Sequence, residues 1–242
     1  DYEGAIEEYT KALEINPEYY IGLTKRGDLK GALEDFVGAI EDYSKAIDID
    51  NSHDYLYYNR GLIKKSINDL KGALEDFDEA ITLNPNSHLC FLKRGETKEL
   101  LNDYAGAIEE YTKALEINPK YCNAFNKRGL AKVFLNDHSG AIEDFSCILE
   151  IWSCDTDSFR NRGIAKAVLN DHAGAIQDFT KALLVKPNYA ECFTSRGYSR
   201  AKTNDHKGAI EDYTKAISLD SNNSVNFFNR GVSKLQLNDY AG

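Results

Sequence analysis

A 34-residue period runs through the chain and constrains its fold more than any other feature. It is marked by an Arg-Gly pair whose glycine recurs at Gly27, Gly61, Gly95, Gly129, Gly163, Gly197 and Gly231. A second glycine column keeps the same interval, at Gly4, Gly38, Gly72, Gly106, Gly140, Gly174, Gly208 and Gly242. Self-similarity of this length is the signature of stacked repeats, so we expect one array along all 242 residues and not a single globular core.

Each period is predicted to form two helices. Apolar residues recur at helical spacing on both sides of an Asn-Asp break, and no strand pattern competes with them. The asparagines favour the left-handed end of the first helix, and the aspartates after them favour the N-cap of the second. The asparagines are Asn68, Asn102, Asn136, Asn170, Asn204 and Asn238. All prolines share one column, where they would stop the second helix; they are Pro17, Pro85, Pro119 and Pro187.

Small residues are expected where the two helices of a pair cross. These are the glycine of each Arg-Gly pair and the alanine after the second glycine, for example Gly129 and Ala141. Only side chains this small let two backbones approach closely, so a larger residue there would overpack the crossing.

Three charged columns run in step with the period. An arginine precedes each glycine of the first column. A lysine or arginine stands four residues after that arginine, as Lys30 does after Arg26. The acidic column consists of Glu8, Asp42, Asp76, Glu110, Asp144, Asp178 and Asp212. We predict that each arginine pairs with an acid of its own or the adjacent hairpin, so that the pairs form a ladder. The alternative interpretation is a solvated charged face.

One stretch is ambiguous. The nonapeptide DLKGALEDF occurs at residues 28–36 and again at residues 69–77, in a different part of the repeat. Leu33, Phe36 and Ile40 keep helical spacing across the place where a turn is due, which favours one continuous helix. The other interpretation is that the array has lost the equivalent of one repeat there.

A 34-residue helix pair with this placement of glycine, alanine, aromatic residues and proline resembles the tetratricopeptide repeat, over essentially the whole chain. The resemblance implies an all-α fold, a right-handed α-α superhelix (solenoid) of stacked antiparallel helix hairpins. The expected units are a second helix at 1–19, full repeats at 20–53, 54–87, 88–121, 122–155, 156–189 and 190–223, and a first helix at 224–242.

In this family the first helices line a concave groove that binds peptides or partner proteins. Carried over by position, the groove residues are Tyr55, Tyr58, Asn59, Leu62, Leu89, Leu92, Lys93, Asn123, Asn126, Lys127, Leu130, Arg160, Asn161, Ile164, Thr194, Tyr198, Phe228 and Asn229. The lining columns nearly balance bases (Lys25, Lys65, Lys93, Lys127, Arg160, Lys202) against acids (Asp28, Glu96, Glu99, Asp157, Glu191). This balance favours a peptide held by apolar pockets and hydrogen bonds.

Composition and charge argue against some classes of partner. A formal charge of -10 and a pI near 5.1 argue against a nucleic-acid backbone as the main partner. The apolar runs are far shorter than the roughly 20 residues of a membrane helix, and no signal peptide opens the chain. Five cysteines without a Cys-x-x-Cys pair fit a reducing compartment. We expect a soluble, cytoplasmic protein with neither a membrane nor a nucleic-acid partner.

No pattern indicates catalysis. The chain has no phosphate-binding glycine loop, nucleophile elbow or paired metal ligands. His138, His172 and His206 recur one period apart, roughly 10 Å if the hairpins stack like packed helices, which is too far for one zinc ion. They are expected to pack in turns. We therefore predict no enzyme activity, no cofactor and no metal site.

Trp152 is the only tryptophan, and it lies in the linker LEIWSCDTD, which lacks the usual proline. We expect it to pack beneath that linker, because tryptophan buries a large area. The alternative is a contact with a partner.

The chain has no methionine and opens and closes within the same turn of the repeat, which suggests a piece of a longer array. Helix 5–15 would then lack a preceding partner and helix 225–237 a following one, and such faces favour head-to-tail self-association. The predicted function is a scaffold that binds an unidentified protein or peptide. The alternatives are a structural spacer, a rod that stacks through its ends, or a regulatory segment of a larger protein.

Overall fold

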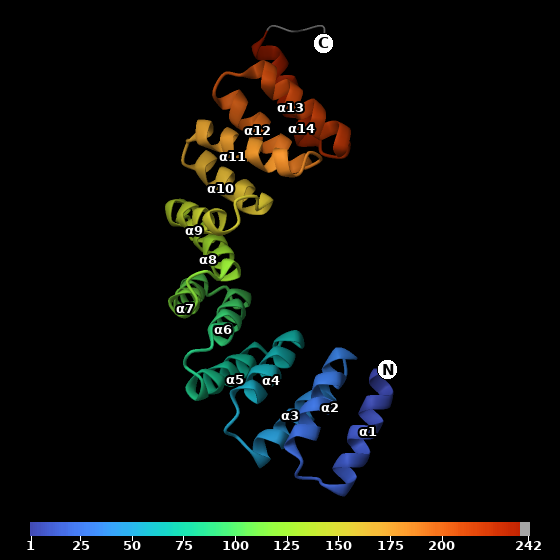
Figure 1. The fold of residues 1–242 in the computed structure, drawn as a ribbon. Helices are drawn as coiled ribbons and strands as arrows, with labels where there is room; N and C mark the ends of the chain where they lie inside the picture. The colour runs from blue at the N-terminus through green and yellow to red at the C-terminus, as the bar shows by residue number, and fades with distance from the viewer. Residues whose placement is uncertain (238–242) are drawn as a thin grey trace. The chain divides into compact units, whose positions relative to one another are not determined.

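The computed structural model describes residues 1–237, which form fourteen α-helices and no strand. Consecutive helices pack as hairpins (Figure 1), which confirms the predicted all-α repeat fold. The helices are α1 (Tyr2–Ile15), α2 (Tyr20–Ala32), α3 (Phe36–Ile49), α4 (Asp54–Ser66), α5 (Leu70–Leu83), α6 (His88–Leu100), α7 (Tyr104–Ile117), α8 (Cys122–Phe134), α9 (His138–Ile151), α10 (Thr156–Val168), α11 (His172–Val185), α12 (Ala190–Lys202), α13 (His206–Leu219) and α14 (Ser224–Gln236). Asn238, Gly242 and the rest of 238–242 lie outside the described residues.

The chain divides into two compact units, Asp1–Ala124 and Phe125–Gly242, and each is considered by itself. Even-numbered helices are the first helices of the repeats and odd-numbered helices are the second. Of the first helices, α2, α4, α6, α10 and α12 each pack on the second helix of their own hairpin and on the second helix before it. Within a unit, first helices also contact the next first helix: α2 with α4, α4 with α6, α10 with α12 and α12 with α14. The side that these helices share is called the first-helix face.

The turns inside the hairpins form as the sequence predicts. Asn68, Asn102, Asn136, Asn170 and Asn204 all have positive φ, between 61° and 64°. The aspartate after each caps the second helix, as where Asp69 accepts a hydrogen bond from the Gly72 N–H at 3.0 Å. A Cβ on Gly72 would lie 2.3 Å from that carboxylate, which explains the second glycine column.

Close packing explains the first glycine column. A Cβ on Gly95 would lie 2.6 Å from the ring of Tyr111, and one on Gly163 would lie 2.8 Å from the ring of Phe179. Ala107, opposite in the same crossing, is completely buried. The small residues therefore mark the crossings, as predicted.

The predicted ladder of ion pairs is present. Arg26 donates two hydrogen bonds to Asp42, at 2.9 and 2.7 Å, and Lys30 Nζ lies 2.8 Å from the same carboxylate. Burial by itself would raise the pKa of Asp42, but Arg26 and Lys30 hold it below its ordinary value of 3.8. The arrangement recurs at Arg60–Asp76, Arg94–Glu110, Arg128–Asp144, Arg162–Asp178 and Arg196–Asp212. Since these acids are buried, the alternative of a solvated face is wrong.

The arginines also join neighbouring hairpins. Nη1 of Arg26 donates a hydrogen bond to the Thr10 hydroxyl of the preceding helix at 3.1 Å. In the same way, the side-chain hydroxyls of preceding second helices accept hydrogen bonds from later arginines: Ser44 from Arg60, Ser146 from Arg162, Thr180 from Arg196 and Thr214 from Arg230. Arg94 instead contacts the Asp78 carboxylate. Each of these arginines thus ties one hairpin to the next, which favours a fixed register more than added stability.

Residues 28–36 contain an ordinary turn, so neither predicted interpretation is right. α2 ends at Ala32, Glu34 takes the left-handed conformation with φ of 64°, and Asp35 caps α3. The Asp35 N–H donates to the Lys30 carbonyl at 2.9 Å, which closes the helix as the equivalent bond does before α5. Hairpin α2–α3 is therefore a complete repeat.

Trp152 does not pack beneath its linker, and that prediction is wrong. It is the C-cap residue of α9 and its side chain is 61% exposed. Asp155 follows as the N-cap of α10, so short-range hydrogen bonds close the linker without the indole.

Candidate functional site

The first-helix face of the first unit carries an apolar pocket between α4 and α6. It encloses about 170 Å³ and is lined by Asp54, Tyr55, Tyr58, Ser87, Leu89 and Cys90. Three of these residues, Tyr55, Tyr58 and Leu89, were predicted groove residues. Tyr58 lies against Phe77 with ring centroids 6.1 Å apart, and burial raises its pKa to about 12, so it is a neutral hydrogen-bonding group.

Charged groups on this face are paired within the first unit. Glu96 accepts from Lys65 at 2.6 Å and from Lys93 at 3.1 Å. Burial would raise the pKa of Glu96, but these two lysines lower it below its ordinary value. Lys25 pairs with Asp28 at 3.2 Å, and the same carboxylate accepts a weak hydrogen bond from Asn59. The lysines of this face therefore already have carboxylate partners.

Two predicted groove leucines of the first unit differ in accessibility. Leu92 is completely buried, so its side chain is not accessible on this face in the structure. Leu62 is half-buried and stays a prediction.

Helix α8 crosses the boundary between the units. Of its predicted groove residues, Asn123 is exposed, and Asn126, Lys127 and Leu130 are half-buried.

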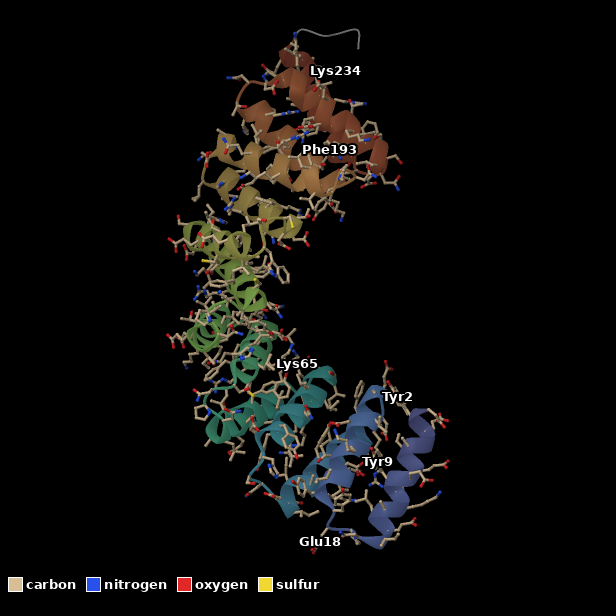
Figure 2. The ribbon with its side chains drawn as sticks, viewed as in Figure 1. Tyr2, Tyr9, Glu18, Lys65, Phe193 and Lys234 are labelled. Atoms are coloured by element: carbon tan, nitrogen blue, oxygen red, sulfur yellow. The ribbon has the colours of Figure 1, made fainter. Side chains whose placement is uncertain are left out.

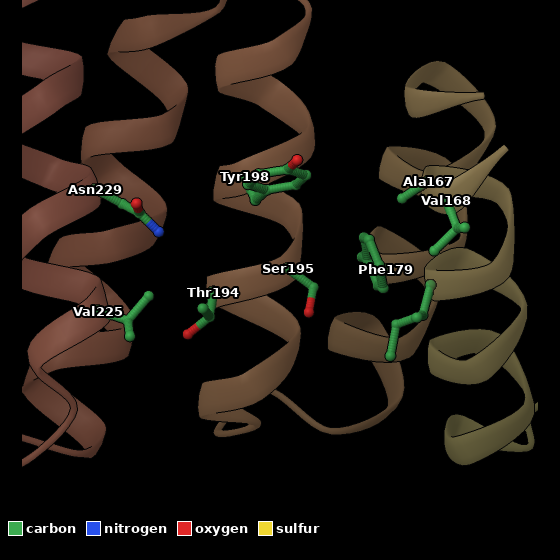
Figure 3. A pocket seen from close by; sticks show the side chains of 9 residues that line it. Ala167, Val168, Phe179, Thr194, Ser195, Tyr198, Val225 and Asn229 are labelled. Carbon is green, nitrogen blue, oxygen red and sulfur yellow. The ribbon is translucent and has the colours of Figure 1, made fainter. Parts of the chain in front are cut away.

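The second unit carries a larger pocket between α10, α12 and α14, shown in Figure 3. It encloses about 350 Å³ and is lined by Ile164, Ala167, Val168, Phe179, Thr194, Ser195, Tyr198, Val225 and Asn229. Ile164, Thr194, Tyr198 and Asn229 come from the predicted groove set. Figure 3 shows Ala167, Val168 and Phe179 on one side of α12 and Val225 and Asn229 on the other. The pocket is thus apolar with a polar rim.

The polar groups of this region differ in their hydrogen bonding. The side chains of Ser195 and Asn229 make no hydrogen bond with any described residue, whereas Thr194 donates to Asn226 at 2.8 Å. Asn161 accepts from Arg160 at 3.2 Å. Phe228 lies beyond the pocket, exposed, in an adjoining depression that Tyr198 also lines.

The bases of the second unit differ from those of the first. Arg160 lies over the ring of Tyr189 and Lys202 over the ring of Tyr198, at 5.9 and 5.4 Å from the centroids. Neither forms an ion pair with a residue of the described part of the chain. Asp157, the nearest groove acid in sequence to Arg160, instead accepts from the Tyr189 hydroxyl at 3.0 Å. The charges on the second unit's face are therefore less fully paired.

Position in the repeat alone could have found more of this site. Val225 occupies the same column as Tyr55 and Leu89, so the 34-residue period already placed it on the first-helix face. Ser87 and Cys90 lie where α6 begins, and Val168 lies where α10 ends, so no groove column identified them.

Other chemistry receives no support from the geometry. Within residues 1–237, no three His, Cys, Asp or Glu side chains come together as metal ligands would. His138, His172 and His206 each begin a second helix. The five cysteines are free, and burial raises the pKa of Cys192 to about 11, away from a reactive thiolate. Among the described helices, none combines the length and apolar character needed to cross a membrane.

Sequence comparisons point to one family. One model described as "Tetratricopeptide repeat" matches residues 55–87, and another of that description matches residues 1–19 and 190–223. A model described as "TPR repeat" matches residues 100–133. No curated protein matches the chain.

Solved structures share the fold. YrrB, described as a TPR protein with an unusual peptide-binding site, aligns with a TM-score of 0.71 and 22% identity over 79% of this chain and 99% of YrrB. A tetratricopeptide repeat protein from Parabacteroides merdae aligns with a TM-score of 0.65 and 20% identity, over 96% of this chain and 92% of its own. The C-terminal part of a TPR repeat-containing protein from Cytophaga hutchinsonii aligns with a TM-score of 0.70 and 20% identity, over 81% of this chain and 78% of its own. With the 34-residue period and the stacked hairpins, these matches show that the chain belongs to the tetratricopeptide repeat family.

Proposed function

We propose that this chain is a protein-interaction scaffold that binds an extended segment of a partner protein along its first-helix face. The observation that carries the proposal is the pocket of the second unit. Its apolar walls suit a large apolar side chain, and Ser195 and Asn229 on its rim are positioned to bond the backbone of a peptide.

Two further observations support the proposal. The first unit repeats the arrangement on a smaller scale, with Tyr55, Tyr58 and Leu89 around an apolar pocket. Tetratricopeptide repeats commonly serve as protein-interaction scaffolds, and YrrB, which has the same fold, is described as having a peptide-binding site. Aromatic anchors with an apolar body and a polar tip, like Tyr198, are typical of binding surfaces.

The test begins with selection of binding peptides from a random display library on residues 1–242. Fluorescence anisotropy then compares the wild type with Tyr198→Ala and Asn229→Ala. Each substitution should weaken the binding of the selected peptide by roughly tenfold or more. Leu184→Ala is the matched control, because Leu184 is 78% exposed on α11 and lines none of these pockets. Variants with unchanged circular dichroism that bind as tightly as the wild type would contradict the proposal, as would a failure to select any peptide.

A structural spacer or self-stacking rod is the competing function. A spacer tolerates Tyr198→Ala and Asn229→Ala without loss, so the same measurement separates the two.

A further inference from the structure

The pocket of the first unit differs in charge from the pocket of the second. Of the described residues that line the first pocket, Asp54 alone is charged at neutral pH. The described lining of the second pocket carries no charge. The first pocket encloses about 170 Å³, whereas sites that hold whole small molecules enclose roughly 300–1,000 Å³. It therefore suits one side chain of a partner.

The carboxylate of Asp54 is fixed in place and half open. Asp54 is the first residue of α4 and is half-buried. Asn84, the C-cap residue of α5, donates a hydrogen bond to its Oδ2 at 2.7 Å. Its Oδ1 has no hydrogen-bond or ion-pair partner within residues 1–237. A carboxylate held in this way is ready to accept a strong hydrogen bond from a cation.

The fold itself does not require this acid. A carboxylate in the first turn of a helix interacts favourably with the helix dipole. However, α2, α6, α8 and α14 form without an acid in the first turn. In the other repeats, the position of Asp54 holds no acid; the residues there are Tyr20, His88, Cys122, Thr156, Ala190 and Ser224. The acid thus distinguishes this one pocket from its equivalents.

The bases of the first-helix face do not neutralise Asp54. Lys65, labelled in Figure 2, lies about three helical turns further along α4, roughly 16 Å along the helix axis. That separation exceeds the Debye length of about 8 Å at physiological ionic strength. Lys65 and Lys93 both contact Glu96 instead. Burial raises the pKa of the Cys90 thiol most, and the charge of Asp54 raises it further, so this charge acts within the pocket.

The walls of the pocket suit the stem of a long basic side chain. Leu89 is 40% exposed and offers apolar surface to the methylene groups of lysine or arginine. Tyr55 and Tyr58 contribute aromatic rings, whose faces attract cations within about 6 Å. A basic side chain can therefore bury its stem here while its charged end reaches Asp54.

We infer that this pocket selects a lysine or arginine side chain of the partner segment, and that Asp54 determines this preference. The inference rests on the proposed function, since it assigns the chemistry of one side chain in the segment that the first-helix face binds. An acidic side chain would be repelled by the Asp54 carboxylate, and an apolar one would leave it without a counter-charge. Because Asn84 occupies Oδ2, one oxygen remains, so the two parallel bonds specific to arginine are not required and lysine is accepted equally.

The test starts from residues 1–242 carrying Tyr198→Ala and Asn229→Ala, so that selection from a random peptide display library reports on the first unit. The selected peptides should share a lysine or arginine. The tightest binder is then synthesised with norleucine, which has an unbranched stem without the charge, or with glutamate in place of that base. Fluorescence anisotropy on the wild-type chain should show roughly tenfold weaker binding of the norleucine form, and weaker binding still of the glutamate form.

Asp54→Asn is the decisive variant, because asparagine keeps the shape of the side chain and still accepts the hydrogen bond from Asn84. On this variant the basic and norleucine forms should bind equally, and Asp54→Lys should prefer the glutamate form. Glu79→Gln is the matched control: it removes one negative charge from an exposed position of α5 that lines none of the pockets described above. It should keep the tenfold preference. A loss of stability would weaken all three peptide forms together, so their ratio reports on the pocket alone.

Three results would overturn the inference. They are a failure of the Tyr198→Ala, Asn229→Ala chain to select any peptide, selected peptides without a shared base, and a preference for the base that survives Asp54→Asn. None of these contradicts the proposed function while the wild type still binds peptides through Tyr198 and Asn229. Conversely, peptides that depend on Asp54 but not on Tyr198 or Asn229 would support the inference and contradict the role proposed for the second unit's pocket.

Discussion

The nonapeptide DLKGALEDF folds in two different ways within one molecule. At residues 69–77, Asp69 caps α5, and Ala73 and Phe77 are completely buried. At residues 28–36, the same nine residues end α2, form a turn at Glu34 and begin α3. Identical local sequence therefore does not specify the local structure.

The flanking residues and the packing decide between the two structures. The copies begin 41 residues apart, seven more than the period, and seven residues are about two helical turns. The apolar pattern consequently fits the helical face in either register. Asn68 supplies the left-handed residue just before the second copy. Before the first copy, Gly27 must stay beneath the Tyr43 ring, which keeps the turn at Glu34. Tertiary packing here overrides local propensity.

The largest expected difference between the copies concerns their phenylalanines. Phe77→Ala should cost about 3–5 kcal/mol of unfolding free energy, because it empties a buried site beside Gly61. Phe36→Ala should cost only about 1 kcal/mol, because Phe36 is half-buried at the start of α3. Urea denaturation followed by circular dichroism measures both. Equal losses would mean that the two copies are buried alike.

The aspartates next to these phenylalanines should differ almost as much. Asp76 is buried between Arg60 and Lys64, so Asp76→Ala leaves two bases without their acid and should cost about 3–5 kcal/mol. Asp35→Ala removes only an N-cap hydrogen bond, worth about 1 kcal/mol. The same urea titration applies, and Asp35→Ser should recover most of the smaller loss. A smaller cost at Asp76 than at Asp35 would refute the buried ladder.

The lysines of the two copies should contribute differently to the pH dependence of stability. Lys30 pairs with buried Asp42 at 2.8 Å, whereas Lys71 is 90% exposed. Because the pKa of Asp42 is below its ordinary value in the folded chain, its pairing stabilises the fold above about pH 4. That stability is lost as the pH falls through the folded pKa. Thermal unfolding between pH 7 and pH 2 should show a weaker pH dependence for Asp42→Asn and an unchanged one for Lys71→Ala. If both variants kept the wild-type pH dependence of thermal unfolding, this would contradict a stabilising role for the Asp42 pairing.

The smallest effect should have opposite signs in the two copies. Glu34→Asn should stabilise the first copy by about 0.5 kcal/mol, since asparagine tolerates the left-handed conformation better than glutamate. Glu75→Asn should destabilise the second copy by a few tenths of a kcal/mol, since it weakens the interior of α5. Hydrogen exchange resolved by peptide gives both local changes. Changes of the same sign would show that Glu34 is not held in a strained turn.

Much of the candidate site could be predicted because a fixed period carries each residue to an equivalent place. Tyr55, Leu89, Ile164 and Tyr198 reach the pockets for this reason. Leu92 shows where that reasoning fails. It shares a column with Phe228, yet Leu92 is completely buried and Phe228 is 71% exposed. Exposure depends on what the neighbouring hairpins place over a position, and a column does not contain that information.

The sequence by itself determined the repeat, the helix pairs and the left-handed asparagines with their aspartate caps, and it predicted the ion-pair ladder that burial of the acids then confirmed. Each of these depends on residues within one period, where helical spacing and capping chemistry act over a few residues. Only the tertiary structure decided the turn at Glu34, the exposure of Trp152 and the burial of Leu92. These features depend on contacts between packed helices, whose energies compete with local propensity and often exceed it.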